Sequence, residues 1–157
     1  MPAPDVLDAH LVLAYTGRAR LAKNLLQSVL RKWHARLPGI VKTTDALVRG
    51  AHDAAKALRD GDLEALGREL DAYWQHKKHM ADGAEPGFIR KMIDILRPHI
   101  HGASLCGAGG GGFLCLITKK PNDLRAIRGA LAAHEDLGDV VLHVATVDHV
   151  GLSLARA

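Results

Sequence analysis

The chain has 157 residues, of which 48% are hydrophobic and 24% charged, and its formal net charge at pH 7 is +4. This length suits one domain with a core of its own, and the composition excludes disordered and fibrous proteins. Because neither a signal peptide nor a long apolar segment is recognisable, we expect a cytoplasmic protein without a membrane partner.

The first part of the chain predicts one strand followed by four helices. Residues 1–8 carry no structural signal, so we expect a disordered or linker start and a domain over residues 9–157. An apolar run at 10–15 predicts a buried strand, and Thr16 is a candidate cap for the helix that follows. Apolar stripes predict four helices with inward faces along residues 22–37, 41–58, 63–74 and 88–96.

Local signals also place helix starts and the remaining elements. Asp62 is the expected N-cap of the third helix, and Pro86 suits the first turn of the fourth. The later part of the chain predicts strand, strand, helix and strand at 103–106, 113–118, 124–131 and 140–147. With the four helices taken as one crossover, the order is β-α-β-β-α-β. We therefore expect an α+β fold: a ferredoxin-like antiparallel four-stranded sheet with a multi-helix crossover insertion and helices mainly on one face.

Between two of these strands lies the densest glycine segment of the chain, the run Gly107-Ala108-Gly109-Gly110-Gly111-Gly112. The bare backbone of such a run can adopt positive φ angles and approach another surface closely. Its G-x-G-x-x-G spacing does not indicate a dinucleotide site, because a strand follows instead of a helix. Phe113 and Leu114 stand where a Walker loop needs Lys and Ser or Thr. The glycine loop of protein kinases also lies in a hairpin, but no H-R-D-type catalytic loop or D-F-G follows here. Two interpretations remain: a plain glycine-rich hairpin, or a hairpin tip that packs against a phosphate or a phosphate-binding loop.

Residues 104–113 resemble the third, C-terminal motif of the GHMP small-molecule kinases. Three further segments, 13–26, 73–80 and 85–92, resemble the L-fucokinase and heptose-7-phosphate kinase branch, and Glu135-Asp136-Leu137-Gly138 fits L-fucokinase best. The resemblance extends from about residue 8 to residue 154 and is collinear throughout, which makes it more specific than the glycines alone.

This resemblance implies a domain of an ATP- and Mg²⁺-dependent sugar kinase that phosphorylates an anomeric hydroxyl. In the family, an N-terminal domain carries the phosphate loop, the magnesium ligands and the catalytic acid, and none of those motifs occurs in this sequence. We therefore expect the C-terminal half of such an enzyme, with no catalytic residue of its own. Alone, it is expected to be inactive and to hold neither ATP nor Mg²⁺. Its expected partners are the N-terminal kinase domain (in the same or a separate chain), a sugar substrate, and a second copy through the exposed domain interface.

The resemblance also implies which residues line the nucleotide or substrate site. These are the run 107–112 together with Ser104, Thr16, Arg20 and Lys77. Each single residue has a plainer alternative: a strand position for Ser104, helix charge pairing for Arg20, and helix-end stabilisation or snorkelling for Lys77. The neighbouring Lys78 is rotated by about 100° on the helix and is expected to be solvated.

The remaining side chains give no separate site. Cys106 and Cys115 flank the glycine run and are expected to be buried free thiols, with a disulfide across the hairpin as the alternative. The ten histidines lack an accompanying set of ligands, so no metal site is expected. The positive charge is not interleaved with aromatic residues, so we expect no nucleic-acid partner.

The alternative function is a non-catalytic ferredoxin-like binding or regulatory module, because the fold alone does not decide the activity. An apolar surface beside the glycine run would favour the kinase interpretation. A closed, polar surface there would favour the module.

Overall fold

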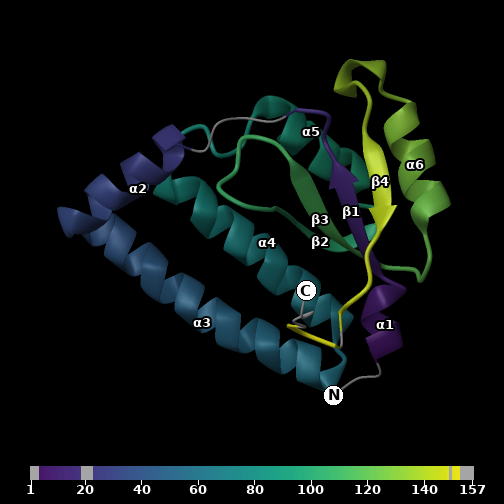
Figure 1. The fold of residues 1–157 in the computed structure, drawn as a ribbon, viewed down its shortest axis with the longest axis horizontal. Helices are drawn as coiled ribbons and strands as arrows, with labels where there is room; N and C mark the ends of the chain where they lie inside the picture. Colours follow the sequence, from purple (N-terminus) through teal and green to yellow (C-terminus); the bar gives the residue numbers. More distant parts are fainter. Residues whose placement is uncertain (1–3, 19–22, 149, 153–157) are drawn as a thin grey trace, which may run out of the picture.

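A four-stranded antiparallel sheet runs through the molecule in the order β2-β3-β1-β4 (Figure 1). The computed structural model describes residues 4–18, 23–148 and 150–152. The strands are β1 (Leu11–Tyr15), β2 (Ile100–Leu105), β3 (Phe113–Thr118) and β4 (Val141–Val144). This order is that of a ferredoxin-like sheet, so the α+β prediction is confirmed and the predicted strands differ from the observed ones only at their ends.

Four helices form the crossover from β1 to β2, as the sequence predicts. They are α2 (Lys23–His34), α3 (Pro38–Asp60), α4 (Leu63–Met80) and α5 (Gly87–Leu96). Helix α6 (Leu124–Ala132) and the short 3-10 helix η1 (Glu135–Leu137) join β3 to β4. The Asp62 carboxylate accepts the N–H of Ala65 at 2.8 Å, which confirms it as the N-cap of α4. In the described part of the chain, no helix has the length and apolar character needed to cross a bilayer.

The chain start differs from the sequence-based expectation. Pro4–Asp8 form a short helix, α1, where we expected a disordered or linker segment. The helix leads directly into β1, and the N–H of His10 donates to the carbonyl O of Leu7 at 2.9 Å. A proline suits a first helical turn, a signal that the expectation did not use.

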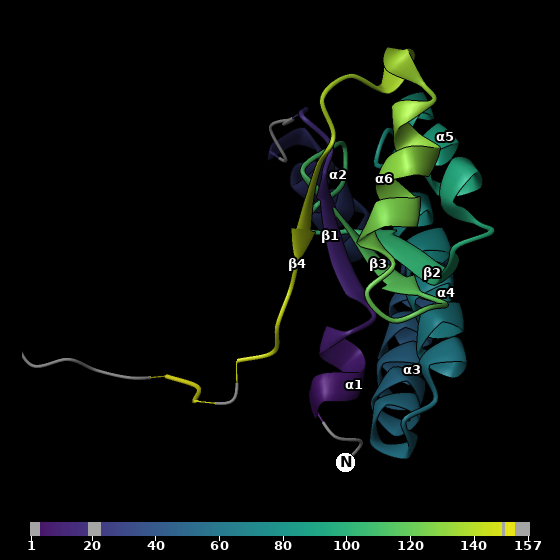
Figure 2. The ribbon, with the colours of Figure 1, turned by 90° about the vertical axis from the view of Figure 1, so that its right-hand side faces the viewer.

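The core lies between one face of the sheet and the helices α5 and α6 (Figure 2). Strand positions that alternate along the sheet supply it, namely Val12, Ala14, Leu114 and Leu116. From the helices come Ile89, Met92, Leu96, Ile127 and Leu131. The opposite sheet face carries Tyr15, Phe113 and His143, and α5 and α6 leave it open (Figure 2).

Helix α4 closes the edge of the sheet at β2. The Asp71 carboxylate accepts the N–H of Ala103 at 2.9 Å and also pairs with the Arg97 guanidinium at 2.5 Å. An edge strand otherwise presents unpaired backbone groups, which cost free energy when they are buried. The helix therefore covers β2 and supplies hydrogen-bond partners for it.

The predicted inward stripe of α2 is not buried. Leu26, Leu30, Trp33 and Leu37 all expose at least a third of their surface, whereas their neighbour Leu25 is buried. Helix α2 lies at the far end of α3, away from the core face of the sheet (Figure 1). The periodicity correctly indicates that one face of the helix is apolar. It does not indicate where the helix lies, and no other element of the described chain covers that face. Ala22, at the start of the predicted stripe, lies outside the described residues.

Candidate functional site

The glycine run forms the tip of the β2–β3 hairpin. The hydrogen-bonded ladder between β2 and β3 ends where the N–H of Cys106 donates to the carbonyl O of Phe113 at 2.7 Å. All five glycines have positive φ angles: 67° at Gly107, 100° at Gly109, 84° at Gly110, 151° at Gly111 and 93° at Gly112. L-residues seldom adopt such angles, so this path requires glycine. We call residues 107–112 the glycine loop.

The middle of the glycine loop packs against Ala84, in the segment between α4 and α5. The N–H of Gly110 donates to the carbonyl O of Ala84 at 2.8 Å. A Cβ on Gly109 would lie 2.8 Å from the same oxygen, so only glycine fits this contact. Both glycines are buried, whereas Gly107 is exposed and Ala108 and Gly111 are partly exposed.

The end of the glycine loop is held by Thr16, which directly follows β1. The N–H of Thr16 donates to the carbonyl O of Gly112 at 2.9 Å, and its Oγ1 accepts the N–H of Gly112 at 3.2 Å. The same hydroxyl donates to the carbonyl O of Arg18 at 3.2 Å. Thr16 is buried and is not the predicted cap of the following helix, because its hydroxyl is bonded to Gly112 and Arg18 and the next two residues are not helical. It joins the glycine loop to β1.

Lys77, near the end of α4, holds the beginning of the glycine loop. Its Nζ donates to the carbonyl O of Leu105 at 3.1 Å and to the carbonyl O of Gly107. The ammonium also lies 5.3 Å from the ring centre of Tyr73 and 5.7 Å from that of Trp74. Lys77 thus neither lies free in solvent nor caps the carbonyls of its own helix. A direct contact with a ligand stays a prediction.

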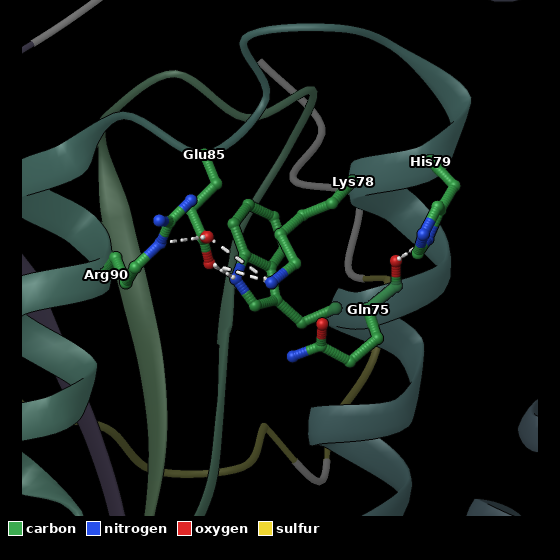
Figure 3. A network of polar contacts seen from close by, with 6 residues as sticks. Gln75, Lys78, His79, Glu85 and Arg90 are labelled. Carbon is green, nitrogen blue, oxygen red and sulfur yellow. Dashed lines mark hydrogen bonds and ion pairs between the residues drawn. The ribbon is translucent and has the colours of Figure 1, made fainter.

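A cluster around Glu85 supports this region, and the sequence reasoning missed it (Figure 3). The Glu85 carboxylate accepts the Trp74 indole N–H at 2.8 Å and pairs with Lys78 at 3.2 Å and Arg90 at 3.1 Å. The expectation of a solvated Lys78 is therefore wrong, because the chain after α4 turns back and brings a carboxylate to it. No local pattern could have indicated this contact.

The Glu85 side chain is only 7% exposed, and two influences on its pKa oppose each other. Burial raises the pKa, whereas the hydrogen bonds from Trp74, Arg90 and Lys78 lower it. Together the hydrogen bonds outweigh burial, and the pKa lies below its usual value. The carboxylate is therefore ionised at neutral pH, and the cluster is fully formed there.

One predicted site residue does not face an open site, and another cannot be placed. Ser104 is buried within β2, and its hydroxyl donates to the carbonyl O of Leu105 at 3.5 Å, so its contact with substrate stays a prediction. Arg20 lies outside the described residues. The nearby Arg18 guanidinium lies 4.4 Å from the ring centre of Phe88.

Both cysteines are free thiols, but they are not both buried. Cys106 is exposed and Cys115 is half-buried, so the expectation is wrong for Cys106, which stands where the hairpin leaves the sheet. Although the residue is exposed overall, partial burial of its sulfur raises the pKa of the Cys106 thiol, and the Lys77 charge lowers it in part. Burial, with a smaller contribution from Cys106, raises the pKa of Cys115 to about 11.

An apolar surface adjoins the glycine loop on the open face of the sheet. The rings of Tyr15 and Phe113 lie 5.2 Å apart, and the His143 ring lies 5.8 Å from Phe113. Phe113 is 40% exposed and Val141, paired with Tyr15, is 48% exposed. The surface at the glycine tip is thus apolar and open. Among the described residues, no group of three His, Cys, Asp or Glu side chains could hold a metal ion.

Comparison with known proteins identifies relatives. The family described as GHMP kinases C terminal matches residues 54–136, which include the glycine loop. The L-fucokinase/L-fucose-1-P guanylyltransferase of Bacteroides fragilis is 30% identical over 128 residues. The bifunctional fucokinase/GDP-fucose pyrophosphorylase of Arabidopsis thaliana is 25% identical over 130 residues. These matches cover 82% and 83% of this chain but only 13% and 12% of the two relatives.

Among solved structures, the fold is similar to that of the mevalonate kinase of L. major in complex with R-mevalonate. The TM-score is 0.73 at 21% sequence identity, and the match covers 85% of this chain and 41% of the other. At this identity the likeness concerns the fold alone.

Proposed function

This chain belongs to the GHMP kinase C-terminal family, and we propose that it is the C-terminal domain of an L-fucokinase-like sugar kinase. In this proposal the full enzyme transfers a phosphoryl group from ATP to the anomeric hydroxyl of a sugar. The observation that carries it is the glycine loop, which is held at its beginning, middle and end beside an open apolar surface. The two fucokinase relatives support the sugar as the acceptor class.

The proposed partner is an N-terminal kinase domain, in the same polypeptide or in a separate chain. The chain spans about an eighth of the curated relatives it matches and 41% of the mevalonate kinase chain, which leaves room for such a domain in those proteins. The proposal assigns the ATP phosphate loop, the magnesium ligands and the catalytic acid to that partner. These 157 residues alone are then expected to show no kinase turnover, and the two free thiols suit a cytoplasmic enzyme.

The residues of this chain fit a supporting role at the nucleotide. Bound ATP with Mg²⁺ supplies the phosphoryl group. The N–H groups of Gly107, Ala108 and Gly111 have no hydrogen-bond partner within the described residues and belong to exposed or partly exposed residues. Such donors suit phosphate oxygens, or the backbone of a phosphate loop that lies against them. Since phosphoryl transfer depends on positioning and charge stabilisation, a rigid loop of donors is useful without being catalytic itself.

The alternative, a non-catalytic binding module, is less well supported. It calls for a closed, polar surface at the glycine tip, whereas Phe113 and Val141 expose apolar surface there. An exposed apolar surface of this kind is typical of a site that another protein surface covers.

A domain-replacement experiment tests the proposal. The homologous segment of the Bacteroides fragilis relative is exchanged for this chain, and phosphorylation of L-fucose is measured with ATP and Mg²⁺. The folded chimera should phosphorylate L-fucose, and the isolated chain should not. A folded chimera that phosphorylates neither L-fucose nor any other sugar of a panel would contradict the proposal, as would robust turnover by the isolated chain.

A further inference from the structure

We propose that Lys77 is a positioning residue that sets the direction of the Ala108 N–H in the glycine loop, supported from behind by the Trp74–Glu85 pair. The conformational part of this inference stands on the contacts of this chain. Only its consequence for phosphoryl transfer rests on the proposed function. Lys77 acts through the loop backbone and is not itself placed at a reacting atom.

The glycine loop needs an external restraint. Five of its six residues are glycines, which lose more backbone freedom on ordering than any other residue. A single ammonium group restrains the beginning of the loop, because the carbonyl groups of Leu105 and Gly107 both converge on Lys77 Nζ. Without that cation, the two carbonyl oxygens, which both carry partial negative charge, would lose the positive group that holds them close together.

The direction of one amide follows from peptide geometry. In a trans peptide unit the C=O of one residue and the N–H of the next point in opposite directions. Since the Gly107 carbonyl is directed at Lys77, the Ala108 N–H is directed away from α4. That N–H has no partner within the described residues and belongs to a partly exposed residue. Lys77 therefore turns a donor outward by holding the carbonyl of the same peptide unit inward.

The position of Lys77 is itself determined by the aromatic rings beside it. Trp74 is 1% exposed, and its indole N–H donates to Glu85 at 2.8 Å, so the ring has little freedom to move. The Lys77 ammonium lies within 5.7 Å of that ring centre and within 5.3 Å of the Tyr73 ring centre. Contacts of a cation with aromatic faces at this distance are attractive. The Lys77 ammonium thus lies between the buried Trp74 ring and the more exposed Tyr73 ring, and both contacts favour its observed position.

The same support reaches the middle of the glycine loop. Glu85 directly follows Ala84, whose carbonyl accepts the N–H of Gly110 at 2.8 Å. Pairing with Trp74, Lys78 and Arg90 fixes Glu85 and therefore its neighbour (Figure 3). The beginning and the middle of the loop depend in this way on one cluster, whereas Thr16 holds the end independently from β1.

Amide hydrogen exchange of the full 157-residue chain, followed by NMR, tests the inference without any assay of activity. Lys77→Met keeps the apolar stem and removes the charge. It should speed exchange of the Cys106 and Gly110 N–H groups about tenfold or more, while the core amide of Leu116 stays protected. Lys77→Arg should restore most of the protection, because the guanidinium supplies the same charge and donors. Lys56→Met, on the exposed face of α3, is the matched control and should change neither amide.

Exchange at Cys106 and Gly110 that stays within about twofold of wild type in folded Lys77→Met would overturn the inference. If Lys77→Met does not fold, Trp74→Phe is the second variant, since it keeps an aromatic ring at this position and removes the N–H that donates to Glu85. It should speed exchange at Gly110 more than at Leu116, and equal effects at both would likewise overturn the inference.

The domain-replacement chimera separates this inference from the proposed function. There, Lys77→Met should lower kcat at least about tenfold and leave the KM for the sugar within about threefold, because only loop geometry changes. An inactive parent chimera with altered exchange in the isolated chain would refute the proposed function and leave the loop inference standing. An active chimera that tolerates Lys77→Met, together with unaltered exchange in the isolated chain, would refute the loop inference and leave the proposed function standing.

Discussion

Gly67 of α4 and Gly102 of β2 lie so close together that a Cβ on Gly102 would be 1.8 Å from the Gly67 carbonyl O. A Cβ on Gly67 would in turn lie 2.4 Å from the Cβ of His101. The contact joins backbone to backbone, so a rotamer change cannot relieve an added methyl group. It sets how closely α4 approaches the edge of the sheet, and with it the positions of Asp71 and Lys77.

Gly102→Ala is therefore expected to destabilise the protein strongly. The added methyl must push α4 away from β2 and weaken the Asp71–Ala103 hydrogen bond, at a cost of about 3 kcal/mol or more. Urea unfolding measures this as a fall in the free energy of unfolding. Gly129→Ala in α6 is the control, because nothing lies within 4 Å of its Cβ and alanine favours a helix by up to about 1 kcal/mol. Equal effects of the two substitutions would contradict the close approach.

Removal of the charge of Glu85 should destabilise the protein in a pH-dependent way. Glu85→Gln keeps an acceptor for Trp74 but loses the charge opposite Lys78 and Arg90, with an expected cost of about 1–3 kcal/mol at pH 7. Since folding lowers the pKa of Glu85, its contribution is complete above the unfolded value of about 4.3. The contribution is lost as the pH falls through the lower pKa of the folded state.

The measurement is the free energy of unfolding of both proteins across that acidic range. The difference between wild type and Glu85→Gln should shrink as the pH falls. Glu64→Gln serves as the control, because its pair with Arg68 is exposed and contributes less than about 0.5 kcal/mol. A difference that is independent of pH would show that the Glu85 charge is not what stabilises the cluster.

Two glycines of the loop should differ in their tolerance of alanine. Gly107→Ala introduces a side chain into open space at a φ of 67°, with an expected cost of about 1–2 kcal/mol. Gly109→Ala adds a clash with the Ala84 carbonyl 2.8 Å away and should also break the Gly110–Ala84 hydrogen bond. Thermal unfolding and exchange at Gly110 measure the difference. If Gly109→Ala is the milder substitution, the loop does not pack against Ala84 as described.

The two thiols should react with iodoacetamide in a defined order. Cys106 is exposed, and Cys115 is half-buried with a pKa of about 11, so only about one in a thousand or fewer Cys115 sulfurs is a thiolate at pH 7.5. Mass spectrometry should find carbamidomethylation at Cys106 first, and at Cys115 only as the pH approaches 10. Cys106→Ser should remove the early modification, and rapid labelling of Cys115 in that variant would contradict the burial that raises its pKa.

The sequence by itself determined the elements whose signals are local. The Asp62 cap starts α4, a short continuous apolar run forms β1, and five glycines allow the positive φ angles of the hairpin tip. Each depends on the preference of a residue for its own backbone conformation or on a period of side chains along one element. The glycine motif and its collinear neighbours likewise indicate the family from the sequence alone.

Only the tertiary structure decided which elements meet. Thr16 reaches Gly112 across 96 positions, and Lys77 finds its carbonyl partners 28 and 30 positions away. The tertiary structure also decided that the apolar stripe of α2 is exposed, because periodicity marks an apolar face without saying what covers it. It likewise decided that Glu85 meets Lys78, because the chain turns back after α4. Pairings between distant segments depend on how the whole chain packs, and no local preference encodes them. The glycine loop could therefore be read from the sequence, whereas the residues that give the loop its shape could not.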